Sequence, residues 1–383
     1  MIHPQPLTGR RIGLLSAWAS RLGGGVFEAV VAQARLLEAA GAHVQVFALR
    51  DQYSGADAAR FAGIQVQTFA VRGPEQIGYA PALLGALEQA RLDCLHLHGI
   101  WMYPSLAASR WARRSGAGYI VSPHGMLDPW ITARGRWKKA LARAAYEQRS
   151  WQRASFLHAL TAREAADIAR ESGRHDSAVI ANPGPPLGAV PLAPRAAKLV
   201  YIGRIHPKKN LITLIEGWHR ATRPAGSTLT IAGWGERADL ARLDSAVRAA
   251  GPSVQFIGPV YGAAKQALLD GARFTVLASH SEGLPMAVLE GWAAGTPAIM
   301  TSQCNLPQGF AAGAALESGY APEPIATVIA KALALDHAAW LSMALAAREL
   351  AAGPFAAETI AARWNDAYLR AIAGKGDNRD RTA

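Results

Sequence analysis

The first half of the chain alternates short apolar runs with segments in which apolar residues recur at helical spacing. The first run, residues 11–17, is followed by three glycines at 23–25. A helical pattern then begins, and these residues share one side of it: Phe27, Val30, Val31, Ala34 and Leu37. An apolar run, a glycine-rich turn and a helix before a second run indicate a βαβ unit. The expected strands of this half are residues 11–17, 43–49, 63–69, 92–98, 118–122 and 158–160.

The alternation restarts after a stretch rich in proline and glycine, Pro183 to Pro194. Such a composition is typical of a segment between domains. The expected strands that follow are residues 198–203, 229–233, 254–258, 274–278 and 297–301. This pattern predicts an α/β protein with two doubly wound parallel sheets, whose ligands bind at the carboxyl ends of the strands and in a cleft between the domains.

The composition agrees with two folded domains. The chain has 383 residues, of which 50% are hydrophobic and 18% are charged, which suffices for two cores. Cys94 and Cys304 have no CxxC spacing, so we expect a reducing compartment and neither a disulfide framework nor a metal site. Arg10 and Arg11 before an apolar run imitate a signal peptide, but the turn and helix behind that run favour a first strand. No other stretch is long and uncharged enough to span a bilayer, and we expect a cytoplasmic protein.

The net charge of +12 is concentrated in one part of the chain. Between Arg110 and Arg153 ten arginines and lysines face only two carboxylates, Asp128 and Glu147. Aromatic residues are interleaved with them: Trp111, Trp130, Trp137, Tyr146 and Trp151. Two interpretations stay open, a surface that lies on anionic lipid at the inner face of the cell membrane and a solvated basic helix whose tryptophans belong to the core. Because no nucleic-acid-binding motif accompanies the charge, we expect no nucleic-acid partner.

Two cations follow the first strand of the second half. Arg204 and Lys209 stand five positions apart in a loop that begins where the strand ends at Gly203. Arginine offers a planar fork of donors and lysine a compact charge, and both favour negative charge that accumulates on a leaving phosphate. The pair therefore fits a diphosphate.

Two carboxylates eight positions apart flank a Gly-Leu-Pro turn in the stretch HSEGLPMAVLE. We expect Pro285 at the first helical position, Glu282 before the helix and Glu290 about a turn and a half inside it. The free amides at the start of such a helix bind anions, and carboxylates beside them accept hydrogen bonds from hydroxyl groups. The stretch is therefore suited to holding a sugar nucleotide.

Together these features resemble the retaining nucleotide-sugar glycosyltransferases of family 4, which have the GT-B fold. The resemblance covers nearly the whole chain and is most specific in three places: Glu282-x7-Glu290, the run from Gly203 to Leu211, and SPHGMLDPW at residues 122–130. The third place is similar to the subgroup associated with extracellular polysaccharide assembly. The segment from Thr359 to Tyr368 resembles the terminal helix that crosses back to the first domain. Where many relatives carry Asn-Gly-Val-Asp before the linker, this chain has Asn182-Pro-Gly-Pro-Pro, which stiffens the hinge region.

The resemblance implies two Rossmann-like domains that face one another across a cleft. The expected parts are an acceptor domain at 1–182, a linker at 183–197, a nucleotide-sugar domain at 198–355, a crossing helix at 356–373 and a flexible tail at 374–383.

The resemblance also assigns roles in the second domain. Glu290 would accept the ribose hydroxyls, Glu282 would hold a hydroxyl of the donor sugar, and Arg204 and Lys209 would bind the diphosphate. Further expected donor contacts are the amides near Gly283, Leu284 and Met286, and Ile257 beside the base.

In the first domain, Gly24 and Gly25 would let the backbone approach the phosphates and the acceptor. His124 would touch the donor sugar, while His98 and Trp101 would line the acceptor pocket. The expected catalytic residues are thus His124, Glu282, Arg204 and Lys209.

The function implied is transfer of a sugar, with retention, from a nucleotide-diphosphate donor to a glycan or lipid-linked acceptor in polysaccharide assembly. No carboxylate is an obvious nucleophile, so we expect front-face displacement in which the departing phosphate takes the acceptor's proton and charge stabilisation carries the rate. No DxD-like metal motif stands in a suitable loop, so Mg²⁺ should be dispensable and no cofactor is expected. The alternatives are a sugar-nucleotide epimerase of the same fold and a basic membrane-bound scaffold with an inactive pocket. The donor base, the sugar and the acceptor are left open.

Overall fold

The computed structural model describes residues 5–190 and 192–374. Its contacts divide the chain into two compact units. The first unit runs to Ala181 and includes the C-terminal segment from Ala361, and the second unit is Asn182–Ile360. Of the expected tail, residues 375–383 lie outside the described part of the chain.

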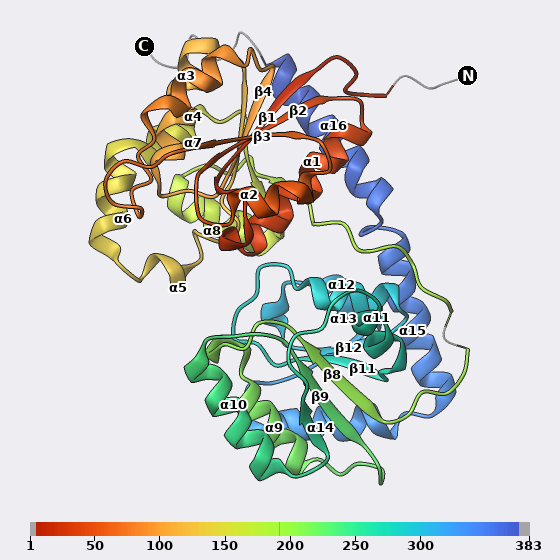
Figure 1. The fold of residues 1–383 in the computed structure, drawn as a ribbon. Helices are drawn as coiled ribbons and strands as arrows, with labels where there is room; N and C mark the ends of the chain where they lie inside the picture. The colour runs from red at the N-terminus through yellow and green to blue at the C-terminus, as the bar shows by residue number, and fades with distance from the viewer. Residues whose placement is uncertain (1–4, 191, 375–383) are drawn as a thin grey trace. The chain divides into compact units, whose positions relative to one another are not determined.

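Each unit is built on one parallel sheet (Figure 1). The sheet of the first unit has the order β3-β2-β1-β4-β5-β6-β7. Its strands are β1 (Arg11–Trp18), β2 (His43–Leu49), β3 (Gln65–Phe69), β4 (Cys94–His98), β5 (Gly118–Ser122), β6 (Phe156–Ala159) and β7 (Ala178–Val179). The order reverses between β1 and β4, so this sheet is doubly wound as predicted, and its switch point lies beside these two strands.

Helices cover both faces of this sheet. Figure 1 shows α3, α4 and α7 on one side of it and α1 and α16 on the other. The helices of the unit are α1 (Gly25–Ala39), α2 (Ser54–Asp57), α3 (Pro81–Gln89), α4 (Tyr103–Ser115), α5 (Pro129–Thr132), α6 (Arg136–Ala142), α7 (Gln148–Arg153) and α8 (Ala162–Ser172). A π-helical segment, Arg143–Glu147, joins α6 to α7.

The second unit repeats the arrangement with the order β10-β9-β8-β11-β12-β13. Its strands are β8 (Lys198–Ile202), β9 (Thr228–Ala232), β10 (Val254–Phe256), β11 (Phe274–Leu277), β12 (Ala298–Met300) and β13 (Ala315–Glu317). Its helices are α9 (Leu211–Arg220), α10 (Arg237–Ala250), α11 (Gly262–Gly271), α12 (Met286–Ala293), α13 (Pro307–Ala311), α14 (Pro322–Ala334) and α15 (His337–Ala352). The switch point of this sheet lies between β8 and β11.

The terminal helix α16 (Ala357–Ala373) begins in the second unit and ends in the first. Within the first unit its Tyr368 hydroxyl lies 2.6 Å from Nδ1 of the buried His96 in β4. Gly118 in β5 leaves room for its backbone, because a Cβ there would stand 2.5 Å from the Ala371 carbonyl oxygen. The helix is therefore fitted closely against the middle of the first sheet.

The proline-rich stretch after Asn182 has no helix or strand in its described part. It is nevertheless tied to the second unit by backbone hydrogen bonds, from Gly184 to the Phe355 carbonyl (2.8 Å) and from Gly188 to the Ala293 carbonyl (2.9 Å). Arg348 adds a bond to the Gly188 carbonyl at 2.7 Å. These contacts fix the path of the segment although its sequence favours no regular structure.

Three expectations about elements need correction. The short strands β7 and β13 were not expected, because a pair of residues and the triplet Ala-Leu-Glu carry little β signal. Pro285 is the N-cap of α12 and not its first residue, since the helix begins at Met286. Glu290 is consequently the fifth residue of the helix, only a little more than one turn inside it.

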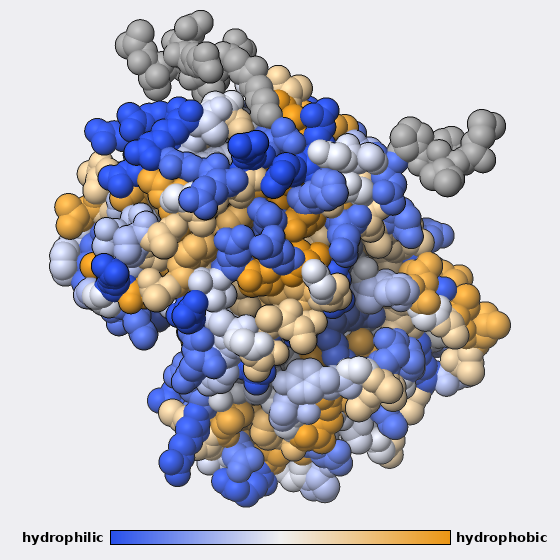
Figure 2. Space-filling view, turned by 45° about the horizontal axis from the view of Figure 1, so that its top comes forward, coloured by the Kyte–Doolittle hydropathy of each residue, from blue (hydrophilic) through white to orange (hydrophobic). Residues whose placement is uncertain are grey.

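The tryptophans of the basic region whose side chains the structure describes fall into two groups. Trp111 and Trp151 are buried in the core of the first unit, whereas Trp137 in α6 is 70% exposed. In the view of Figure 2 hydrophilic and hydrophobic residues are interspersed over the surface. In the described part of the chain no single helix is long and apolar enough to cross a membrane, although one bent pair, Pro322–Ala334 with His337–Ala373, passes the test of length and composition.

Candidate functional site

Lys209 and Glu282 form an ion pair that is largely shielded from solvent, at the switch point of the second sheet. The loop after β8 ends in a short 3-10 turn, Pro207–Lys209, and Glu282 follows β11. The Lys209 ammonium lies 2.5 Å from both carboxylate oxygens of Glu282, and the two side chains are only 13% and 7% exposed. The Ser279 hydroxyl donates to the same carboxylate at 2.7 Å. The tertiary structure thus joins two residues that sequence analysis assigned to different parts of the donor.

The backbone that carries Glu282 is held from a third loop. The Asn305 amide donates to the Glu282 carbonyl at 2.6 Å and to the Gly283 carbonyl at 3.1 Å. Gly283 is exposed, while Leu284 and Met286 are half-buried at the start of α12. The first backbone N–H groups of a helix have no intrahelical acceptor, so this end of α12 can bind an anion.

Arg204 is directed to a different partner from Lys209. Its side chain is 45% exposed, pairs with Glu236 at 3.1 Å and lies over the Trp234 ring at 5.6 Å. Both partners belong to the loop after β9, which reaches close to the loop of Arg204: a Cβ on Gly233 would stand 1.8 Å from the Gly203 carbonyl oxygen. Sequence analysis did not find these partners, because nothing local links the two loops.

Glu290 also has a cation of its own. Lys265 in α11 lies 2.6 Å from its carboxylate, and the two side chains are partly exposed. Ile257 follows β10 with its side chain exposed and its N–H bonded to the Ile231 carbonyl at 3.0 Å. Lys265 was missed because a lysine on an amphipathic helix looks like an ordinary solvated residue.

In the first unit, three neighbouring strands end at one level. Ser16, His98 and Ser122 are register partners across β1, β4 and β5. The segments that follow these strands carry Gly24, Trp101 and His124 respectively. The sheet therefore brings the sequence motifs of this half to its switch point.

His98 and His124 are stacked and joined by a hydrogen bond. His98 Nδ1 lies 3.0 Å from His124 Nε2, and the rings are 5.2 Å apart. Desolvation by burial lowers the pKa of His124 to about 3 and the pKa of His98 well below its usual value, so both rings are neutral near pH 7. His124 has a positive φ of 53°, and the buried Glu164 accepts from the next backbone N–H, that of Gly125, at 2.6 Å. The ring is therefore placed by a constrained loop.

His98 lines a cavity of about 150 Å³ together with Gly23, Ser16 and Met126. Its Nε2 is buried without a partner among the described residues. Gly24, with φ 55°, caps α1, and neither it nor Gly25 would bring a Cβ within 4 Å of another atom. The glycine turn thus leaves open space beside the cavity.

Trp101 lines a different hollow from His98, although we expected both in one acceptor pocket. It borders a pocket of about 620 Å³ with residues of α5, α6, α7 and α8. Its backbone N–H donates to the buried Glu147 at 2.5 Å, and burial raises the pKa of Glu147 to about 7. Trp101 has a positive φ of 80°, and its ring packs edge-to-face against Trp151.

The comparisons with known proteins agree with this architecture. Residues 24–184 match the family model described as a glycosyl transferase 4-like domain, and residues 196–334 match the model of glycosyl transferases group 1. The chain is 32% identical over 188 residues to a glycogen synthase of Mycobacterium tuberculosis, a match that covers 47% of this chain and 44% of that protein. The matched part therefore spans less than half of that relative.

Solved structures resemble nearly the whole chain in fold. The Anabaena protein Alr3699/HepE in complex with UDP superposes with a TM-score of 0.76 at 15% identity, covering 94% of this chain and 99% of that one. The sucrose-phosphate synthase of Thermosynechococcus elongatus gives 0.73 at 18% identity, covering 95% and 99%. With both halves matched by glycosyltransferase models and the two doubly wound units in place, the chain belongs to the family 4-type glycosyltransferases with the GT-B fold.

Proposed function

We propose that the protein transfers a sugar, with retention of its anomeric configuration, from a nucleoside-diphosphate donor to a glycan or lipid-linked acceptor. The reaction needs no metal and serves the assembly of extracellular or cell-surface polysaccharide. The observation that carries this proposal is the Lys209–Glu282 pair, held almost out of solvent at the switch point where a doubly wound sheet binds its ligand.

The pair supplies charges that a sugar nucleotide can use. A diphosphate would draw the Lys209 ammonium, and the freed Glu282 carboxylate would accept hydrogen bonds from hydroxyls of the sugar. In the displacement the bond between the anomeric carbon and the phosphate oxygen breaks as the acceptor oxygen attacks from the same face. The acceptor's proton passes to the leaving phosphate, whose charge Lys209 stabilises.

The remaining residues position the donor. Glu290, with Lys265 at 2.6 Å, is suited to the ribose hydroxyls. His124 contributes a neutral hydrogen-bonding ring and not an acid, because burial keeps its pKa near 3. Arg204, on its exposed loop, adds a second cation for the diphosphate.

A uridine nucleotide is the first donor to try, because HepE was solved with UDP and with UDP-glucose. The test is a panel of nucleotide sugars screened by thermal shift with the full-length protein in EDTA, since a ligand of the native state raises the unfolding temperature. The stabilising donor is then incubated with candidate acceptors, and the anomeric configuration of the product is read by NMR.

We expect release of nucleoside diphosphate and a product with the donor's configuration. An inverted product, or activity that returns only with Mg²⁺, contradicts the mechanism. A changed sugar still attached to its nucleotide identifies an epimerase instead.

A further inference from the structure

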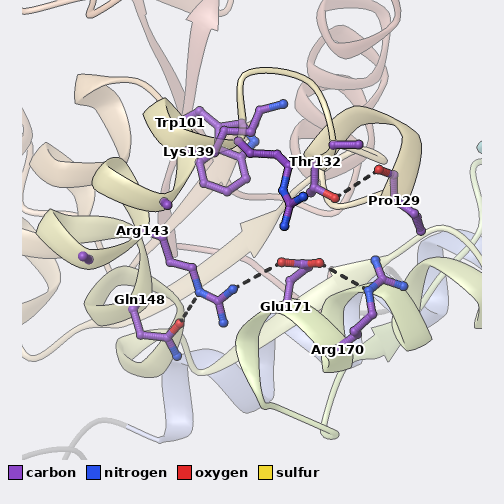
Figure 3. A pocket seen from close by; sticks show the side chains of 12 residues that line it. Trp101, Pro129, Thr132, Lys139, Arg143, Gln148, Arg170 and Glu171 are labelled. Carbon is purple, nitrogen blue, oxygen red and sulfur yellow. Dashed lines mark hydrogen bonds and ion pairs between the residues drawn. The ribbon is translucent and has the colours of Figure 1, made fainter.

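The first unit contains a basic pocket that the proposed transfer chemistry does not use. Its volume is about 620 Å³, within the size range of small-molecule sites. It lies among residues of α5, α6, α7 and α8, and the lining residues that matter here are Trp101, Arg136, Lys139, Arg143, Arg170 and Glu171. Figure 3 shows arginines reaching into this space from two sides, with Glu171 between Arg143 and Arg170.

The charges of the pocket are out of balance. Four cations, Arg136, Lys139, Arg143 and Arg170, line it with one carboxylate, Glu171. Glu171 lies 3.3 Å from both Arg143 and Arg170, and Arg170 also pairs with Asp167, so the excess charge belongs to Arg136, Lys139 and Arg143. The unbalanced charge favours an anionic ligand.

The cations differ in how much of their bonding capacity is already used. Arg170 has a structural role, because it also binds Asp167 at 2.6 Å and the Leu127 carbonyl at 3.0 Å. Arg143 uses Nε for Gln148 and Nη1 for Glu171, which leaves Nη2 for a ligand. Arg136 has no ion pair or hydrogen bond to any residue that the structure describes, and its side chain is exposed.

The pocket also has a rigid aromatic wall. The Trp101 backbone is bound by Glu147 and by the Tyr146 hydroxyl, which donates to its carbonyl at 2.9 Å. Its ring meets Trp151 edge-to-face at 5.7 Å. The π-helical segment between α6 and α7 begins at Arg143 and ends at Glu147. One short element therefore carries both a cation of the pocket and the carboxylate that binds the Trp101 backbone. Such segments are frequent at functional sites.

We propose that this pocket binds a phosphate or diphosphate group carried by the acceptor, with Arg136 and Arg143 as its direct ligands and Trp101 against the adjoining sugar ring. Arginine forks match phosphate oxygens in pairs, and an aromatic face suits the apolar side of a pyranose. The role of the bound molecule as the acceptor rests on the proposed function, whereas anion binding by the pocket does not. The proposal thus names the acceptor class as phosphate-bearing.

The test is calorimetric titration of the full-length protein with inorganic pyrophosphate at low salt. We expect wild type to bind at two places, the pocket and the donor site around Lys209. The double variant Arg204→Gln with Lys209→Gln removes the donor site, and the remaining binding should weaken by about tenfold or more when Arg136→Gln and Arg143→Gln are added, since each bond to a charged group is lost. The matched control is Lys138→Gln with Arg149→Gln, which removes the same charge from nearby exposed positions outside the pocket.

Each other outcome overturns the proposal. The pocket has no anion site if pyrophosphate binding disappears in the donor-site variant, or if the control pair weakens it as much as the pocket pair. Binding to anionic vesicles without binding to free pyrophosphate would make these residues a headgroup surface. Because the exposed Arg136 has no hydrogen bond or ion pair with another described residue, Arg136→Gln alone can serve as the test if the double variant folds poorly. If the pocket does not bind pyrophosphate, the protein can still turn over its donor, so this outcome does not contradict the proposed function.

Discussion

At the scale of single residues, the two carboxylates of the donor region are paired with different cations, and their substitutions should change different kinetic constants. Glu290 would touch the ribose, which changes little during reaction, so Glu290→Gln should mainly raise KM. Glu282 would grip the ring as it flattens, so Glu282→Gln should lower kcat, by an amount comparable with the roughly 10²- to 10³-fold loss expected for Lys209→Ala. Steady-state kinetics in EDTA with a fixed acceptor provide the measurement. Similar behaviour of the two variants with near-normal turnover would contradict these roles.

Histidines with lowered pKa values make the first unit sensitive to acid. Burial lowers the pKa of His124 to about 3 and that of His158 to about 4, below the usual value near 6.5 that they regain on unfolding. Between these values the unfolded chain binds more protons than the folded one, so stability is fully present above pH 6.5 and is lost as the pH falls toward 4. Each such histidine contributes a slope of about 1.4 kcal/mol per pH unit.

Urea unfolding at pH 7, 6 and 5 measures this slope. His158→Asn should flatten it, because one imidazole that must charge on unfolding is gone. The exposed His219 of α9 is the control, and His219→Asn should leave the slope as in wild type. An unchanged slope in His158→Asn would mean that this ring is already charged in the folded protein.

At the scale of elements, the packing of α16 against β5 depends on the absence of a side chain at Gly118. A Cβ on Gly118 would meet the Ala371 carbonyl oxygen at 2.5 Å and its carbon at 2.8 Å, and helix backbone cannot yield as a side-chain tip can. Gly118→Ala should therefore destabilise the protein by about 1–3 kcal/mol and loosen the end of α16. Thermal unfolding and limited proteolysis of the C-terminal segment report the two effects.

The matched substitution is Gly85→Ala inside α3, where a new Cβ has no atom within 4 Å. It should be neutral or stabilise by about 0.5–1 kcal/mol, since glycine is unfavourable inside a helix. Equal stability of the two alanine variants would show that α16 is not tightly fitted at β5.

At the scale of the whole molecule, the excess positive charge is the reason to propose a membrane-binding surface. In α6 the exposed Trp137 and Leu141 stand beside Arg136 and Lys138, a combination that suits an anionic bilayer surface. Lys139 is better left unchanged, because its ammonium binds the carbonyls of Ile131 and Arg134.

Replacing Arg134, Arg136 and Lys138 by glutamine should weaken binding to phosphatidylglycerol vesicles by about 100-fold, at roughly 1 kcal/mol for each charge. Co-sedimentation with anionic and neutral vesicles measures this, with circular dichroism as the check on folding. Undiminished binding to the anionic vesicles would assign the charge to solvation or to an anionic acceptor.

The sequence by itself determined the repeated alternation of strand and helix, the break near Pro183 and most strand positions, because period and turn residues are local signals. It also placed Glu282 just before a helix start. Only the tertiary structure decided that Lys209 pairs with Glu282, 73 positions away, and that Lys265 pairs with Glu290. It also decided that His98 and Trp101, three residues apart, line separate hollows. These outcomes depend on strand order at the switch points and on the packing of loops from distant strands, and no local pattern of residues carries that information.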